Sequence, residues 1–259
     1  MIHPTAVVSP KAELDSTVEI GPYAIVENHV KMGARTKVMA HAYVTGYTEI
    51  GEDNQIHMGA VIGHFPQDLK FDPSTRSYLK VGHRNVFREY ATVHRGTELE
   101  SSTVIGSDNF LMGGAHVAHN CHIGNKVIIC NYAVLAGHSH VADQVFISAS
   151  VMIHQFIHVG RLVMFSGGAG VSRDVPPFMM ACERNEIWSI NLVGLQRGGV
   201  SPESVKEIKR LYKIFYRSGL NITNALKKIE EENFQSSEVK EFVEFIKNSP
   251  NGVLPHREM

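Results

Sequence analysis

Medium-sized aliphatic residues recur at every sixth position over most of this chain. The longer run begins at Ile105 and ends at Val171 without a break, and an earlier run leads from Ile2 to Ile62. A period of six fits neither an α-helix nor a strand that alternates faces every two residues. It is typical of hexapeptide repeats, which form a parallel β-helix. Three hexapeptides would close one triangular coil of about 18 residues, with the aliphatic side chain pointing inward.

The residue after the inward aliphatic is often glycine, for example Gly33, Gly51 and Gly106. Glycine suits a tight corner because it has no Cβ and adopts backbone conformations that are costly for other residues. We therefore expect these positions to form the corners of the coil. A single coil cannot bury its inner face, so the repeats are expected to stack into one long column.

The period breaks clearly once, between Ile62 and Val81, where the step exceeds a multiple of six by one and shifts the phase. Residues 64–79 are therefore predicted to leave the column as a loop, and loops on a rigid scaffold often carry function. Residues 94–103 are a second candidate loop. Leu99 keeps the phase there, so the pattern alone leaves this second loop open.

The repeat stops near Val171, because Pro176 and Pro177 cannot continue a paired strand. Residues 178–200 resemble a connector, and apolar residues at helical spacing follow them. Residues that favour N-cap positions precede these segments and predict three helices. The expected caps are Ser201, Thr223, and Ser236 or Ser237.

The chain is thus predicted to be mainly β with an α-helical tail. Residues 1–190 would form the β-helix, with a protruding loop near 64–79, and residues 191–259 would form a small helical domain. A unit of that size is not expected to be stable alone. We expect it to pack on the column or on a neighbouring subunit.

Charge and composition exclude several classes of function. The net charge of −1 provides no basic field for nucleic acid. No apolar stretch is long enough to predict a membrane span, and the N-terminus lacks the charged and apolar regions of a signal peptide. Three cysteines without a CxxC spacing suit a reducing compartment, so a cytoplasmic protein is expected.

The chain contains 15 histidines, and two groups of them suggest different roles. His122, His140 and His158 are each separated by three hexapeptides, the length of one coil, and should stack on successive coils as a ladder. Such a ladder could be a metal site or a solvated surface feature. The second interpretation is favoured, because three stacked imidazoles do not by themselves provide tetrahedral geometry.

A second group contains His119, His138 and His154, which closely follow their inward aliphatics on neighbouring coils. Each could project outward, toward a ligand or a neighbouring subunit. A neutral imidazole can take a proton from a hydroxyl near pH 7, so this group is a candidate catalytic site.

Five basic residues share one face of the first predicted tail helix. This face could be merely solvated, or it could dock an acidic protein. The residues are Lys206, Lys209, Arg210, Lys213 and Arg217.

Several short motifs follow one another along the whole chain. They are PQDLK at 66–70, TVHRGT at 92–97, GSDNFLM at 106–112, AHVAHNCHIGN at 115–125, LAGH at 135–138, HQF at 154–156, DVPPF at 174–178 and NLVGLQRGG at 191–199. Together they resemble the acyl-carrier-protein-dependent UDP-N-acetylglucosamine acyltransferases that begin lipid A synthesis. The resemblance includes the helical tail. It implies a left-handed parallel β-helix, a triangular prism of hexapeptide repeats.

The resemblance also implies an activity. Members of this family transfer a 3-hydroxyacyl group from acyl carrier protein to the 3-position of UDP-N-acetylglucosamine. The resemblance implies a homotrimer with active sites between subunits, and no metal or organic cofactor.

Residue roles are carried over motif by motif. His119 is similar to the general base that deprotonates the sugar hydroxyl, and Gly137 to the residue whose N–H stabilises the thioester oxyanion. Asp68 and Lys70 correspond to contacts with the sugar and phosphates. The other substrate-binding positions that the resemblance implies are His116, Asn120, His138, His154, Gly167 on the acyl groove, and the nucleotide contacts Gln155, Asn191 and Arg197.

Three positions depart from the family pattern. Asn120 stands where the family usually has an acidic residue, and an amide raises the basicity of a nearby imidazole less than a carboxylate does. That substitution suggests either a weaker base or a more reactive acceptor, such as a 3-amino sugar. Arg184, near the expected end of the acyl groove, leaves the chain length open, and Gly198 replaces a second arginine after Arg197.

Two functions of other classes compete. A γ-type carbonic anhydrase would need three histidines converging on zinc, and the loop and the helical tail do not suit it. A non-catalytic scaffold would leave the histidine and QDLK motifs without a purpose.

Overall fold

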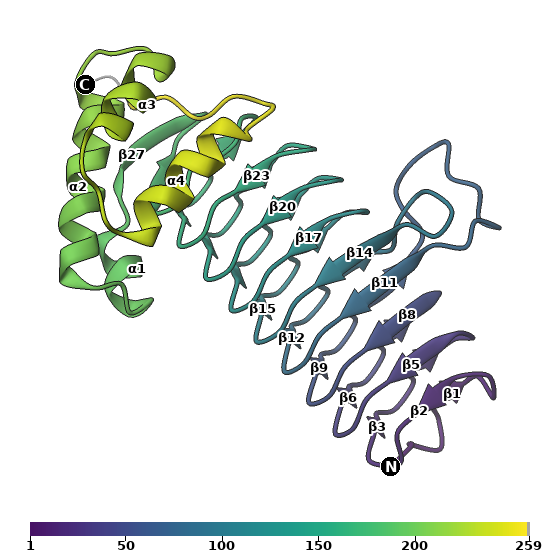
Figure 1. The fold of residues 1–259 in the computed structure, drawn as a ribbon. Helices are drawn as coiled ribbons and strands as arrows, with labels where there is room; N and C mark the ends of the chain where they lie inside the picture. The colour runs from purple at the N-terminus through teal and green to yellow at the C-terminus, as the bar shows by residue number, and fades with distance from the viewer. Residues whose placement is uncertain (258–259) are drawn as a thin grey trace.

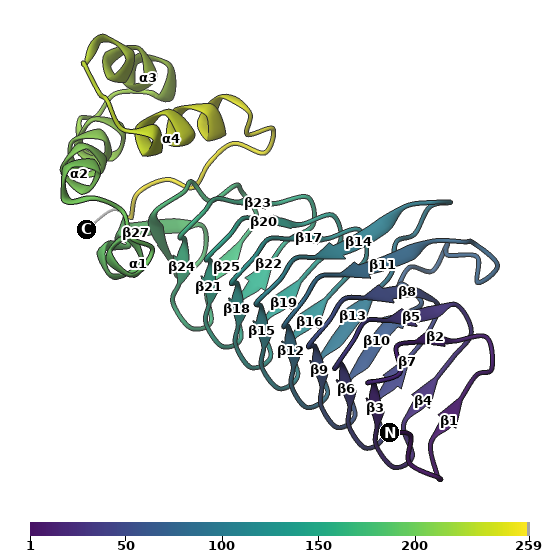
Figure 2. The same cartoon turned by 60° about the horizontal axis from the view of Figure 1, so that its bottom comes forward.

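Strands of two to five residues form a three-sided column, a left-handed parallel β-helix, with helices at one end (Figure 1). This computed structural model describes residues 1–257. Successive strands enter three different sheets in turn, so every third strand lies beside its predecessor (Figure 2). The fold predicted from the six-residue period is confirmed.

The three sheets are named here after the order in which the chain enters them. The first sheet contains β1 (Val7–Val8), β4 (Ile25–Val26), β7 (Tyr43–Val44), β10 (Val61–His64), β13 (Thr92–His94), β16 (His116–Val117), β19 (Val134–Leu135), β22 (Met152–Ile153) and β25 (Gly170–Val171). The second contains β2 (Glu13–Leu14), β5 (Val30–Met32), β8 (Tyr47–Ile50), β11 (Tyr78–Val81), β14 (Ser102–Ile105), β17 (His122–Ile123), β20 (His140–Val141) and β23 (His158–Val159). The third contains β3 (Glu19–Ile20), β6 (Lys37–Val38), β9 (Gln55–Ile56), β12 (Val86–Phe87), β15 (Phe110–Leu111), β18 (Ile128–Ile129), β21 (Phe146–Ile147), β24 (Met164–Phe165), β26 (Met179–Cys182) and β27 (Glu186–Ile190).

The inward aliphatic positions form the core of the column. Every member of the series from Ile105 to Val171 is buried, as is every member from Ile20 to Ile62. Each such side chain stabilises the fold by about 1.5–3 kcal/mol. Ile2 is 52% exposed, because it belongs to the first coil and has no coil beneath it.

Apart from Gly63 (φ 83), the glycines directly after the inward aliphatics do not adopt the left-handed φ of the turns, so that expectation was wrong for most of them. The left-handed φ values fall two residues further on, for example at Arg35 (φ 59) and Asp53 (φ 59). A Cβ on Gly51 would lie 2.6 Å from the carbonyl oxygen of Gly82 in the next coil. Glycine is needed there because stacked coils approach closely, not because the chain turns.

Two loops interrupt the column, and the pairing of the first sheet reveals them. Val7 pairs with Ile25, the equivalent position three hexapeptides later. Val61 pairs with Tyr43 of the coil before it, but its partner in the next coil is Thr92, much further along the chain. The excess length lies in the first loop. This loop is shorter than predicted, because β10 ends at His64 and β11 begins at Tyr78.

The six-residue period of the sequence does not reveal the second insertion. Thr92 pairs with His116, one hexapeptide beyond the position that an ordinary coil would reach, and the extra length enters between β13 and β14. An insertion of one hexapeptide preserves the phase of the repeat. Leu99 matched the pattern for this reason, yet it is 71% exposed and is not a core residue.

The tail contains α1 (Leu192–Arg197), α2 (Pro202–Arg217), α3 (Ile222–Glu231) and α4 (Ser237–Lys247). The predicted caps Ser201 and Ser236 are confirmed, and each side chain accepts a hydrogen bond from a main-chain N–H. Helix α3 is capped by Asn221 instead of Thr223. Residues 178–200 are more than a connector, because they contain β26, β27 and α1.

The helices pack on the C-terminal end of the column, as one of the two expected arrangements (Figure 1). Arg161 pairs with Glu241 of α4 at 2.8 Å, and the Asp174 N–H donates to the carbonyl of Gly252. Within residues 1–257, no helix has the length and apolar character needed to cross a membrane. Residues 258–259 of the predicted helical domain lie outside the described part.

Candidate active site

The candidate catalytic histidines all lie at one corner of the prism, where the chain passes from the first sheet to the second. His119 lies between β16 and β17, His138 between β19 and β20, and His154 between β22 and β23. The loops at 65–77 and 95–101 leave the same corner on the coils below. The topology therefore stacks the three histidines and both loops along one edge.

His119 lies against the next coil at Gly137. A Cβ on Gly137 would lie 2.5 Å from Cε1 and 2.7 Å from Nε2 of the imidazole. The ring of His119 also meets that of His138 edge-on, with 5.3 Å between centroids, and His138 stacks on Phe156 at 4.7 Å. Only glycine at position 137 leaves room for this arrangement.

A hydrogen bond sets the tautomer of His119. Its Nδ1 lies 3.0 Å from Oδ1 of Asn120, and the Thr97 N–H donates to the same oxygen at 3.0 Å. Because a main-chain N–H can only donate, that amide atom is an acceptor, and His119 must carry its hydrogen on Nδ1. The neutral ring then has a free lone pair on Nε2, as a general base requires.

The N–H of Gly137 makes no hydrogen bond to any residue of the described part of the chain. Gly137 itself lies against the imidazole of His119. A free N–H beside a base can stabilise negative charge that develops on a carbonyl oxygen. The predicted base, His119, and the predicted oxyanion donor, Gly137, therefore lie next to each other.

Neighbouring histidines are held neutral around His119. Burial, and then the proximity of His116, lower the pKa of His94 to about 4. Burial and the nearby His119 likewise lower the pKa values of His116 and His138. Neutral neighbours do not repel a positive charge that forms on His119 during proton transfer.

His94 was missed as a site residue, although it belongs to the TVHRGT motif. It is buried, and its ring meets that of His116 edge-on at 5.0 Å. His116, on the outer face of the first sheet, also shares a hydrogen with Thr92 Oγ1 at 2.7 Å. No sequence signal separates the buried His94 from the exposed His154, because each directly follows an inward aliphatic residue, Val93 or Ile153.

The remaining residues predicted at this corner are exposed. Asp68 Oδ1 accepts the Lys70 N–H at 2.9 Å, which shapes the tip of the first loop. His154 and Gln155 project from the coil above His138. Their contacts with substrate remain predictions.

Three predicted residues lie away from this corner. Gly167 follows β24, where the chain turns from the third sheet to the first, and a Cβ there would meet only the Ala149 oxygen, at 3.7 Å. Asn191 is buried, and both ends of its side chain are already hydrogen-bonded within the chain. Its oxygen accepts from the Gly194 N–H, and its nitrogen donates to the Leu162 carbonyl.

Arg197 lines a hollow of about 580 Å³ on the outer side of the third sheet, with Phe146 and Met164 among its neighbours. In a three-sided prism, the third sheet lies opposite the corner between the first and second. A single chain therefore does not bring Arg197 to His119.

The predicted ladder of His122, His140 and His158 is confirmed. On the outer face of the second sheet, the His122 and His140 rings stack with 4.7 Å between centroids, and the His158 ring, tilted by 35°, lies 4.8 Å from that of His140. Burial and the two flanking imidazoles lower the pKa of His140 to about 4. Within residues 1–257, no group of three histidine, cysteine or acidic side chains is arranged to hold a metal ion.

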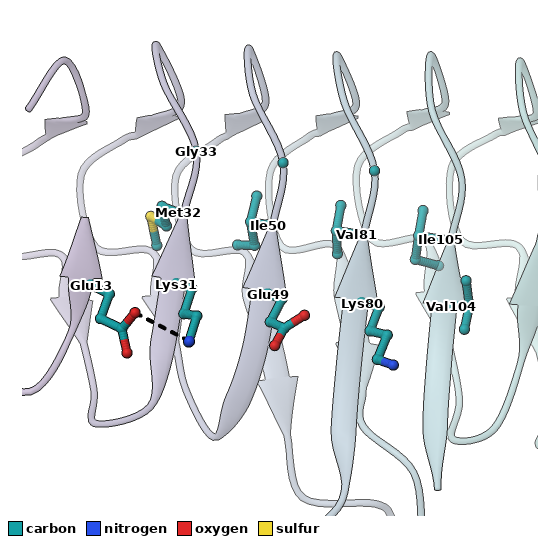
Figure 3. A pocket seen from close by; sticks show the side chains of 12 residues that line it. Glu13, Lys31, Met32, Gly33, Glu49, Ile50, Lys80, Val81, Val104 and Ile105 are labelled. Carbon is teal, nitrogen blue, oxygen red and sulfur yellow. Dashed lines mark ion pairs between the residues drawn. The ribbon is translucent and has the colours of Figure 1, made fainter. Parts of the chain in front are cut away.

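A second hollow, of about 670 Å³, lies on the same face nearer the N-terminus (Figure 3). Glu13, Lys31, Glu49 and Lys80 alternate in charge across neighbouring strands there, and Glu13 pairs with Lys31 at 3.2 Å. None of the predicted site residues lines this hollow, so the hollow has no part in the candidate site.

The buried neutral His94 makes folding depend on pH. Its pKa is about 4 in the folded chain and about 6.5 in an unfolded one, so the unfolded chain binds more protons between these values. The contribution, on the order of 3 kcal/mol, is complete above about pH 6.5 and is lost as pH falls toward 4. We expect His94→Asn to flatten the pH dependence of urea unfolding between pH 7 and 4.5. An unchanged slope would contradict this assignment.

Known proteins resemble this chain over its whole length. A family model described as UDP N-acetylglucosamine O-acyltransferase, domain 2, matches residues 174–254, and one described as bacterial transferase hexapeptide matches residues 102–137. The acyl-[acyl-carrier-protein]–UDP-N-acetylglucosamine O-acyltransferase of Thermodesulfovibrio yellowstonii is 43% identical, over 97% of this chain and 98% of its own.

Solved structures agree with the sequence comparison. The UDP-N-acetylglucosamine acyltransferase of Francisella novicida is 35% identical with a TM-score of 0.95, covering 100% of this chain and 95% of its own. That of Bacteroides fragilis is 40% identical with a TM-score of 0.91, covering 98% and 99%. Likeness of this extent, in sequence and in fold, means that the chain belongs to the family of acyl-[acyl-carrier-protein]–UDP-N-acetylglucosamine O-acyltransferases.

Proposed function

We propose that this protein transfers a 3-hydroxyacyl group from acyl carrier protein to the 3-hydroxyl of UDP-N-acetylglucosamine, the first step of lipid A biosynthesis, in the cytoplasm. The names of its relatives support the reaction. The observation that carries the chemistry is the imidazole of His119, with Nε2 free, beside the unbonded N–H of Gly137.

The reaction needs one base and one oxyanion donor. His119 Nε2 takes the proton from the sugar 3-hydroxyl, whose oxygen attacks the thioester carbonyl carbon. The Gly137 N–H stabilises the negative charge on the former carbonyl oxygen. When the intermediate collapses, the carbon–sulfur bond breaks, and the imidazolium returns its proton to the leaving thiolate. The enzyme thus ends in its starting state.

Substrate binding is proposed for the exposed residues of the same corner. Asp68 and Lys70 would hold the sugar and phosphates. His138 and His154 would position the two substrates, and Gln155 would contact the nucleotide. His116 flanks the base, and the open space at Gly167 would border the acyl chain. Residues 1–190 and 191–259 are proposed to act as the two domains of this enzyme.

We further propose a homotrimer in which each site is shared. Arg197, with Asn191 behind it, is the proposed nucleotide contact and lies on the side of the prism opposite His119. The third sheet also presents a row of half-buried apolar side chains on its outer face, which is typical of an interface. The row contains Val86, Phe110, Ile128, Phe146 and Met164.

Shared sites can be tested by mixing two inactive variants. His119→Ala and Arg197→Ala should each abolish turnover, but co-expressed subunits should regain about a quarter of wild-type activity, because one site in four would pair two intact faces. Native mass spectrometry should show three chains. Absence of recovery in mixed trimers would contradict a site built from two subunits.

The carrier protein is proposed to dock on the basic face of α2. Lys206, Lys209 and Lys213 are exposed along it, and no ion pair within residues 1–257 involves them. Arg210 contributes less, because it pairs with Glu232. Unpaired cations attract an acidic partner and speed its association.

Product analysis tests the proposed reaction. The purified protein would be supplied with 3-hydroxyacyl carriers of several chain lengths and with either UDP-N-acetylglucosamine or its 3-amino analogue. Mass spectrometry should reveal an acyl ester of UDP-N-acetylglucosamine, and the preferred carrier gives the chain length. Transfer to the 3-amino sugar alone, or to neither, would contradict the proposal.

A further inference from the structure

The side chain of Asn120 is hydrogen-bonded at both ends. Its Oδ1 faces Nδ1 of His119 and accepts the Thr97 N–H, both at 3.0 Å, while its Nδ2 donates to Oε2 of Glu98 at 3.1 Å. We propose that Glu98 is a positioning residue for the base: acting through Asn120, it supplies the carboxylate that position 120 lacks. The inference rests on the proposed function of His119.

The contacts around Asn120 permit only one orientation of its amide. The Thr97 hydroxyl also lies 2.9 Å from Oδ1, and the Asn120 N–H donates to Thr103 Oγ1 at 2.8 Å. A rotated amide would set its NH₂ group against the Thr97 N–H and leave two acceptor oxygens facing each other at Glu98. Glu98 therefore selects the orientation in which His119 must donate through Nδ1.

Glu98 belongs to the insertion between β13 and β14. Its main-chain N–H donates to Ser101 Oγ at 3.0 Å, which holds the loop in a tight turn. Burial raises the pKa of Glu98, but hydrogen bonds from Thr97 and from its own N–H outweigh burial and lower it overall. The side chain is thus ionised at neutral pH. The insertion brings a negative charge to within two hydrogen bonds of His119.

A carboxylate in this place strengthens the base as well as orienting it. Charge on Glu98 polarises the Asn120 amide, and the polarised carbonyl stabilises the imidazolium that forms during the reaction. The other titratable groups that face His119 are His94, His116 and His138, all with lowered pKa values. Glu98 is consequently the negative group that offsets the charge on His119.

Removing the charge should weaken the base without weakening substrate binding. We expect Glu98→Gln to lower kcat about three- to tenfold with KM unchanged, and to move the acid limb of the kcat/KM profile to lower pH, because imidazolium is stabilised less. Glu100→Gln is the matched control. Glu100 lies on the same loop, pairs with Arg76 at 3.4 Å, and should leave both readouts unchanged.

Exchanging the two functional groups provides the decisive test. In the Asn120→Asp variant, a carboxylate oxygen of Asp would face Oε2 of Glu98 at about the 3.1 Å that now separates Nδ2 of Asn120 from Oε2. The two carboxylates would then share a proton, and kcat should fall. Glu98→Gln combined with Asn120→Asp restores one amide and one carboxylate, with every hydrogen bond still possible. The double variant should return to within about threefold of wild-type kcat.

The outcomes separate this inference from the proposed function. Additive losses in the double variant, or a Glu98→Gln profile identical to that of wild type, would overturn the role of Glu98. A wild-type protein without turnover would overturn the proposed function instead. In that case, an NMR titration of the His119 ring still tests the inference without substrate, since its midpoint should fall in Glu98→Gln and stay in Glu100→Gln.

Discussion

Replacing His119 with alanine is expected to lower kcat by about 10²- to 10⁴-fold, the usual contribution of a positioned general base. The free Nε2 of this ring is set by the hydrogen bond from Nδ1 to Asn120, and alanine offers no substitute for it. Since His119 is only partly buried and lies in a turn, its loss should not unfold the column. Steady-state turnover with acyl carrier protein and UDP-N-acetylglucosamine measures the effect.

His122→Ala is the matched control. His122 lies in the next strand of the same coil, but it belongs to the ladder on the outer face of the second sheet. We expect near-normal kcat for this variant and an unchanged subunit number for both. If His119→Ala kept a tenth or more of wild-type turnover, His119 would not be the base.

Gly137→Ala is the second change with a large expected effect. The added methyl would lie 2.5 Å from the His119 ring, so the imidazole must move off the oxyanion donor. Displacing a catalytic group by about 1 Å can cost about 10²-fold in rate. We expect a loss of that order in kcat, with the melting temperature little changed.

Gly113→Ala shows whether any methyl at this place in the repeat is harmful. Gly113 likewise stands two residues after an inward aliphatic. Its added methyl would lie 3.2 Å from the end of the Asn131 side chain and in ordinary contact, at 3.4 Å, with the Glu89 carbonyl oxygen. That amide can shift, so activity should be retained. Equal losses in both variants would mean that Gly137 acts through the fold and not through His119.

The positions of the catalytic residues could be predicted only in part. Motif likeness indicated His119 and Gly137, and the structure places one on the other. Glu98 carried no signal, because it is an exposed acid in an insertion that leaves the six-residue phase intact. Its contact with Asn120 joins two different coils and exists only because the insertion returns to the same corner.

The sequence by itself determined the column. The six-residue period specifies which side chains are buried. Because this pattern repeats in every coil, the three sheets and the core follow from the period. Helix caps such as Ser201 are equally local.

Only the tertiary structure decided which groups meet. Stacking sets which turns lie one above another, and therefore joins His119 to Gly137 and Glu98 to Asn120 across separate coils. It also places Arg197 on the opposite side of the prism from His119. These relations depend on insertion lengths and on the three-sided cross-section, which no single stretch of residues encodes.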